Sequence, residues 1–117
     1  MKKIEAIIKP YKLNPLMIEL EKIGITKLTA EEVKGFGRRK SVSNFYKVKK
    51  GMNFMLEYLP KLKLYIIVED NIVDDVIQII LKNTSTKEIG DGKIFVTEVL
   101  DCIDIRSGER GFCGNPD

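Results

Sequence analysis

A glycine-rich turn in the last third of the chain offers the most specific chemistry in the sequence. Gly90-Asp91-Gly92-Lys93 follows a polar stretch that holds Thr86 and precedes an alternating apolar segment. Closely spaced glycines expose backbone N–H groups and permit left-handed conformations, which together form an anion-binding nest, and Lys93 adds a cation. An ordinary Asp-Gly turn is the alternative interpretation. The spacing is not that of a Walker motif.

Two further segments combine glycine with arginine. Gly35-Phe36-Gly37-Arg38 ends a predicted strand, where backbone can approach a ligand and a guanidinium is at hand, although a hinge would explain the same residues. Arg106 lies in a tail after the last predicted strand, where a solvated tail is the alternative. Each of these patterns alone is weak.

The composition excludes most catalytic chemistry. The chain has no histidine, which removes the usual general base and the commonest transition-metal ligand. Cys102 and Cys113 do not form a Cys-x-x-Cys motif, and without a secretion signal we expect them to be reduced. Hydrolytic and zinc-dependent catalysis are therefore not expected, and we predict no catalytic residue and no metal site.

The net charge of +3 is unevenly distributed along the chain. Residues 34–50 carry +7 without an acidic residue, which leaves −4 on the remainder. Aromatic residues among these lysines are typical of an arm that docks on an acidic partner. A solvated surface loop is an alternative, and +7 on one loop is a modest footprint for nucleic acid, which we do not expect as a partner.

Hydrophobic spacing predicts the elements that position these segments. Period-two alternation predicts strands over 2–9, 25–34, 61–68 and 94–100. Helical spacing predicts one helix capped by Asn14 and stopped by Gly24, and a second one capped by Asp70 or Asn71. Residues 35–53 lack sustained periodicity, which in a compact domain usually marks a functional loop.

The two halves of the chain repeat one pattern. Ile4, Ala6 and Ile8 precede Leu64, Ile66 and Val68 by about sixty residues, and each strand leads to a capped helix and another strand. Two βαβ units predict a single α+β, ferredoxin-like domain over 1–117, with a four-stranded antiparallel sheet and both helices on one face. The bare face predicts a homo-oligomer, because apolar residues are available to it: Ile7, Ile67, Phe95 and Val99. Without an apolar run long enough to span a membrane, we expect a cytoplasmic protein.

These pieces, in this order, resemble the PII signal-transduction family, the trimeric regulators of nitrogen metabolism. The resemblance covers nearly the whole chain. Its most specific motif is Gly90-Asp91-Gly92-Lys93-Ile94-Phe95 with the preceding Thr86. Other matching segments are the opening Met1–Pro10, Glu32-Val33-Lys34-Gly35-Phe36-Gly37-Arg38, Leu59-Pro60-Lys61 and Ile105-Arg106-Ser107-Gly108-Glu109.

The resemblance implies a homotrimer that binds ATP or ADP in clefts between subunits. Residues that match the family's nucleotide site include a loop over 84–93, with Arg106 of the 101–117 tail reaching in from a neighbour. The matching residues are Thr29, Gly35, Gly37, Arg38, Thr86, Gly90, Asp91, Gly92, Lys93 and Arg106. No bond need be broken, so an effector-binding switch explains the missing histidine better than an enzyme does, and we expect no enzyme activity.

The resemblance also implies that the segment 37–56 is a partner-binding loop that changes shape with the nucleotide and with 2-oxoglutarate. Its target would be a nitrogen-assimilation enzyme or a membrane transporter, which would bring the protein to a membrane without insertion. Lys61 matches the family lysine that pairs with 2-oxoglutarate. The candidate docking residues are Lys40, Phe45, Tyr46, Lys47, Lys49, Lys50 and Phe54.

The sequence departs from the family pattern at several positions. Arg39 replaces a Gln that can give an oxygen to Mg²⁺, which puts magnesium-bridged 2-oxoglutarate binding in question. Asp104 replaces an Arg and would repel phosphate if it pointed inward, so the preference between ATP and ADP stays open. The loop is longer than usual, and Phe54 stands near the tyrosine that many members modify, which argues against uridylylation.

The sequence is consistent with three functions. The first is an adenylate-sensing PII regulator of a nitrogen-related transporter or enzyme. The second is a PII-like paralogue that senses ATP and ADP without 2-oxoglutarate and serves another transport or metabolic system. The third is a nucleic-acid-binding protein that uses the basic loop.

Overall fold

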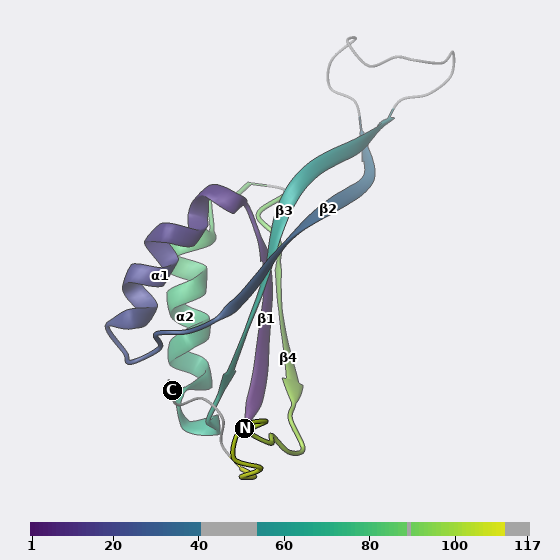
Figure 1. The fold of residues 1–117 in the computed structure, drawn as a ribbon. Helices are drawn as coiled ribbons and strands as arrows, with labels where there is room; N and C mark the ends of the chain where they lie inside the picture. Colours follow the sequence, from purple (N-terminus) through teal and green to yellow (C-terminus); the bar gives the residue numbers. More distant parts are fainter. Residues whose placement is uncertain (41–53, 89, 112–117) are drawn as a thin grey trace.

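The computed structural model describes residues 1–40, 54–88 and 90–111, and for 36–40 and 54–59 the backbone alone. The elements follow the order β1 (Lys2–Ile8), a 3₁₀ turn (Pro10–Lys12), α1 (Leu13–Glu21), β2 (Thr29–Lys40), β3 (Phe54–Val68), a second 3₁₀ turn (Asp70–Ile72), α2 (Val73–Thr84) and β4 (Lys93–Glu98). The strands form one antiparallel sheet in the order β2-β3-β1-β4, and both helices cover one of its faces (Figure 1). The predicted ferredoxin-like double βαβ fold is confirmed.

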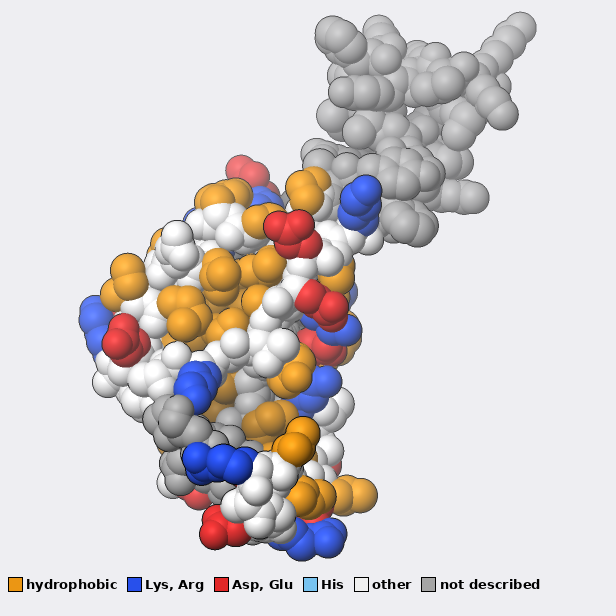
Figure 2. Space-filling view, in the orientation of Figure 1, with side chains coloured by type: hydrophobic (Ala, Val, Ile, Leu, Met, Phe, Trp, Pro, Cys, Tyr) orange, Lys and Arg blue, Asp and Glu red, His pale blue; other side chains and the backbone are white. Residues whose placement is uncertain are grey.

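The repeat in the sequence becomes the centre of the sheet. The first strands of the two halves, β1 and β3, lie side by side, with Ile4 opposite Ile66 and Ala6 opposite Leu64. These side chains are buried, as are Leu16 and Leu20 of α1 and Val76 and Ile80 of α2. Figure 2 shows hydrophobic side chains gathered between α1 and the strands, with charged side chains around them. Alternate strand residues therefore bury one face under the helices.

Neither helix begins with the side-chain cap that the sequence predicts. The chain enters each helix through a 3₁₀ turn, whose i→i+3 bonds join Lys12 N–H to the Lys9 carbonyl and Ile72 N–H to the Glu69 carbonyl. Neither helix has a side-chain N-cap bond, so Asn14 is not a cap. The 3₁₀ turns satisfy backbone groups that a capping side chain would otherwise satisfy.

The edge strand β2 begins later and ends later than the strand predicted over 25–34. It begins at Thr29 and continues past Gly35 to Lys40, and its ladder with β3 runs as far as Lys40 opposite Phe54. Residues 35–40, predicted to be irregular, are therefore strand, and both ends of the 37–56 segment belong to a two-stranded ribbon that projects from the sheet (Figure 1). Residues 41–53 lie outside the described part of the chain.

The sheet face without helices is less apolar than the sequence suggested. Ile7, Ile67 and Val99 are half-buried and Phe95 is exposed. Charged groups lie among them: Lys63 forms an ion pair with Glu5 at 3.2 Å, and the Lys3 ammonium lies 4.7 Å from the centroid of the Tyr65 ring. Within the described ranges, no helix is long and apolar enough to span a membrane.

The segment after β4 folds back on itself. Ile103 and Arg110 form a β-bridge, and Arg110 forms an ion pair with Asp101 at 2.6 Å. Cys102 is disulfide-bonded, so the expectation of a reduced thiol at this position is wrong. That expectation rested on cellular compartment alone, which carries no information about which groups the fold brings together. Cys113 lies outside the described residues.

Candidate functional site

Three parts of the chain meet at one end of the sheet. The loop 84–93 connects α2 to β4 and lies at the end from which the β2–β3 ribbon projects (Figure 1). Lys61 of β3 donates from Nζ to the Gly90 carbonyl oxygen at 2.5 Å. Lys9, immediately after β1, forms an ion pair with Asp91 at 3.3 Å. The predicted anion-binding loop is therefore held by both central strands.

Two glycines of the loop adopt backbone angles that other residues rarely adopt. Gly90 has a φ of +99° and Gly92 a φ of +106°, values in the left-handed region that favours glycine. A β-carbon on Gly92 would lie 1.7 Å from the carbonyl oxygen of Ile7. Gly92 is therefore required both by its backbone angle and by its close approach to β1.

Asp91 and Thr86 face each other across the loop. The Thr86 N–H donates to one carboxylate oxygen of Asp91 at 2.7 Å, and the Thr86 hydroxyl donates to the other. These bonds from Thr86, with the nearby Lys9 ammonium, hold the pKa of Asp91 well below its usual range. Both side chains were predicted to line a nucleotide site, whereas in the structure they close the loop on itself.

Two lysines supply positive charge beside the loop. Lys93, at the start of β4, is exposed and forms no ion pair or side-chain hydrogen bond that involves another described residue. The Lys61 ammonium is held on the Gly90 carbonyl. A hollow of about 240 Å³ adjoins the loop, lined by Ile7, Ile8, Leu81, Thr84, Ser85, Asp91, Gly92, Lys93 and Ile94. Exposed backbone N–H groups and a free ammonium can bind phosphate oxygens at this point.

The predicted residues of β2 lie along its ladder with β3. Gly35 pairs with Leu59 and Gly37 with Glu57. A β-carbon on Gly35 would contact the Lys61 side chain at 3.6 Å, an ordinary distance, so space alone does not require this glycine. Thr29, the first residue of the edge strand β2, lies opposite Tyr65, roughly 20 Å from Gly35 at the rise of a strand.

The side chains of several other predicted residues lie outside the described ones. For Arg38, Arg39, Lys40 and Phe54 the structure gives the backbone alone, and these residues pair within the β2–β3 ladder. The remaining predicted docking residues are outside the described part of the chain: Phe45, Tyr46, Lys47, Lys49 and Lys50.

The segment after β4, which includes Arg106, lies at the opposite end of the sheet from the 84–93 loop (Figure 1). It follows Val99, whose N–H donates to the Met1 carbonyl at the start of β1. The length of β1, roughly 20 Å, separates these two ends. Asp104 is turned onto its own segment, because its carboxylate accepts from Ser107 N–H at 2.9 Å. The structure therefore does not bring Arg106 together with the 84–93 loop of the same chain.

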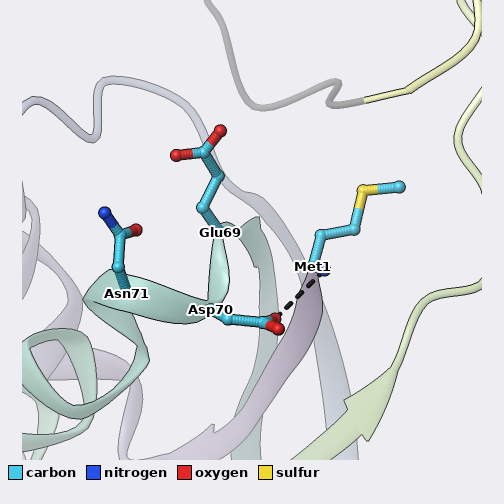
Figure 3. A pocket seen from close by; sticks show the side chains of 4 residues that line it. All are labelled: Met1, Glu69, Asp70 and Asn71. Carbon is cyan, nitrogen blue, oxygen red and sulfur yellow. Dashed lines mark ion pairs between the residues drawn. The ribbon is translucent and has the colours of Figure 1, made fainter.

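A second, shallow hollow of about 380 Å³ lies near the N-terminus and is lined by Met1, Glu69, Asp70 and Asn71 (Figure 3). The Met1 ammonium forms an ion pair with Asp70 at 3.1 Å, and Lys2 lies 3.8 Å from the same carboxylate. None of the predicted site residues lines this hollow. Across 1–40, 54–88 and 90–111, no group of three acidic or cysteine side chains could hold a metal ion.

Lys9 contributes an ion pair to the loop, although it is not among the residues predicted for the site. It joins the end of β1 to a loop 82 positions further along the chain. No local sequence pattern indicates this role, because a lysine before Pro10 indicates only the end of a strand. Pairing Lys9 with an acidic residue of the loop required knowing the strand order.

Comparisons of the sequence and of the fold with known proteins find similar proteins over most of the chain. The family model described as nitrogen regulatory protein P-II matches residues 1–109. The chain is 49% identical to nitrogen regulatory protein P-II 1 of Escherichia coli over 94% of this chain and 96% of that protein. It is 45% identical to nitrogen regulatory protein P-II of Azospirillum brasilense over 95% and 96%. A crystal structure of Arabidopsis thaliana PII bound to citrate superposes with a TM-score of 0.73 at 36% identity, covering 94% of this chain and 84% of that one.

Proposed function

Since the chain belongs to the nitrogen regulatory protein P-II family, we propose that it senses adenine nucleotides and, through its 37–56 segment, controls a transporter or an enzyme of nitrogen metabolism. The family consists of regulators rather than enzymes. Under this proposal ATP and ADP are effectors, and no bond is broken.

The proposal rests mainly on the backbone angles and the exposed lysine of the 84–93 loop. Gly90 and Gly92 adopt positive φ angles, and Lys93 stands exposed beside them. Backbone N–H groups and an ammonium are the donors that phosphate oxygens prefer. In this proposal Lys93 binds a phosphate, whereas Thr86 and Asp91 hold the loop in shape and contact the nucleotide mainly through their backbone.

A homotrimer completes the site in this proposal. The segment that includes Arg106 leaves β4 at the far end of its own sheet, so Arg106 would add charge to a nucleotide at the loop of another copy. The sheet face without helices, with half-buried Ile7 and Ile67 and exposed Phe95, would pack between copies. Charged pairs such as Glu5 with Lys63 lie on the same face, where they would fix the register of packing.

The output segment is 37–56 in this proposal, within a single PII-like domain that also includes the 101–117 tail. The base of this segment is coupled to the nucleotide loop, because Lys61 lies on β3 and its ammonium is bonded to Gly90. A ligand that competes for the Lys61 ammonium would change how β3 is held. The target is a protein in the cytoplasm or at the cytoplasmic side of a membrane transporter.

A second candidate differs in the role of 2-oxoglutarate. Arg39 has no oxygen to give to Mg²⁺, and Lys61 is already bonded within the protein. Both facts favour a paralogue that responds to ATP and ADP alone and regulates another transport or metabolic system. A nucleic-acid function would need the basic segment alone and leaves the 84–93 loop unexplained.

Calorimetric titration tests the proposal and separates the candidates. ATP and ADP are titrated into the protein with Mg²⁺, with and without 2-oxoglutarate, and the molecular mass is measured by light scattering. Saturable binding to a trimer supports nucleotide sensing. Enhancement by 2-oxoglutarate identifies the nitrogen regulator, and its absence identifies the paralogue. A monomer that binds neither nucleotide would contradict both.

A further inference from the structure

An aspartate in the middle of an anion-binding loop requires an explanation. In the sequence Asp91 lies between Gly90 and Gly92, the two glycines whose backbone groups would face a phosphate. A negative charge at this place opposes the binding of another anion. Its side chain is mostly covered, with 20% of its surface exposed.

Lys9 opposes that charge from the other side of the loop. Its ammonium lies 3.3 Å from Oδ1 of Asp91, and its side chain is 23% exposed. Thr86 donates its N–H and its hydroxyl to the same carboxylate. The carboxylate is thus bonded to Lys9 at the end of β1 and to Thr86.

The backbone around Lys9 is fixed on both sides. β1 ends at Ile8, and the Lys9 carbonyl accepts a hydrogen bond from Lys12 N–H at 3.0 Å in the 3₁₀ turn that begins at Pro10. The carbonyl of Ile7, two residues earlier, is packed against Gly92. Lys9 therefore projects from a rigid position, as a group must if it is to hold a loop in one conformation.

We propose that Lys9 is a positioning residue of the anion loop: by pairing with Asp91 it both neutralises that carboxylate and fixes the 84–93 loop against the end of β1. This inference rests on the proposed nucleotide function for its effect on affinity. Its effect on the loop itself is independent of any ligand.

Four variants separate positioning from direct ligand contact. Lys9→Met removes the ammonium, Lys9→Arg keeps a cation, Asp91→Asn removes the opposing charge while keeping an acceptor for Thr86, and the double variant combines Lys9→Met with Asp91→Asn. Lys2→Met is the matched control, because Lys2 lies at the other end of β1, is 26% exposed and is also ion-paired. The readouts are the dissociation constant for ATP and hydrogen exchange of the 84–93 loop without nucleotide.

We expect Lys9→Met to weaken ATP binding about fivefold, the scale of one partly exposed charge interaction, and to speed exchange of the loop. Lys9→Arg should restore both, and Lys2→Met should change neither. Adding Asp91→Asn to Lys9→Met should recover most of the lost affinity, because no uncompensated carboxylate then remains.

Two results would overturn the inference. Unchanged loop exchange in Lys9→Met would show that the pair does not hold the loop. An ATP affinity in Lys9→Met equal to that of the unmodified protein would show that the pair does not prepare the loop for the ligand. If the unmodified protein binds no nucleotide, the proposed function fails, and the exchange measurement still decides whether Lys9 positions the loop.

Discussion

Lys61 of β3 donates a hydrogen bond to the carbonyl oxygen of Gly90, 29 positions away in the sequence, at 2.5 Å. This bond joins the strand that enters the projecting ribbon to the loop that carries Lys93. A ligand at the loop therefore has a short physical route to the base of the 37–56 segment.

The first prediction concerns this coupling. ATP should change the rate at which trypsin cleaves after the basic residues of 38–50, and Lys61→Met should reduce that change at least severalfold. The Lys61 ammonium is the group that couples β3 to the loop, and its loss removes the coupling. Peptide mapping by mass spectrometry measures the cleavage rates. Lys82→Met, on the exposed side of α2, is the control, and an equal ATP effect in the Lys61 variant would disprove the coupling.

The second prediction concerns Gly92. Gly92→Ala should destabilise the fold by about 2–3 kcal/mol or more, because a β-carbon would collide with the Ile7 carbonyl and the backbone would stay at positive φ. Gly24→Ala is the control, since Gly24 has a φ of +88° but open space around it. It should cost only about 1 kcal/mol. Urea unfolding at a fixed protein concentration measures both, and equal costs would mean that the close approach to β1 is unimportant.

Much of the fold could be predicted because its pattern is local. Alternation in Ile4, Ala6 and Ile8, repeated in Leu64 and Ile66, marks the central strands, and period two is a property of neighbouring residues. β2 beyond Gly35 could not be predicted in this way. This part of β2 is a strand because its backbone pairs with β3. Backbone pairing does not require alternating apolar side chains, so the sequence shows no period-two pattern there.

In the candidate site, too, local features could be predicted and contacts between distant residues could not. Gly90, Gly92 and Lys93 could be predicted from their spacing and from the family resemblance, because the nest is a short local motif. The orientation of Asp91 and the part played by Lys9 could not, since their pairing spans most of the chain. The position of Arg106 at the far end of the sheet likewise follows from the direction of β4.

The third prediction is a pH dependence from Asp91. Thr86 and Lys9 lower its pKa in the folded protein, whereas the unfolded chain has a pKa of about 3.9. A lowered folded pKa contributes stability that is present above the unfolded pKa and is lost as the pH falls toward the folded one. The stability difference between the unmodified protein and Asp91→Asn should therefore be largest above about pH 4 and shrink in acid.

Urea unfolding of both proteins at a series of pH values from neutral to acid measures this difference. Other acidic groups with lowered pKa values, such as Asp70, are present in both proteins and cancel in the comparison. A difference that stays constant on acidification would show that the Asp91 carboxylate is not stabilised by its partners.

In the proposed function, Lys93 and the glycine nest beside it bind the phosphates of an adenine nucleotide. The most direct test is the dissociation constant of ATP measured by calorimetry for the unmodified protein, Lys93→Ala and the control Lys82→Ala. Loss of a charge-assisted contact should weaken binding in Lys93→Ala by about 1–3 kcal/mol, roughly 5- to 150-fold, and leave Lys82→Ala unchanged. An ATP affinity in Lys93→Ala equal to that of the unmodified protein would contradict the claim.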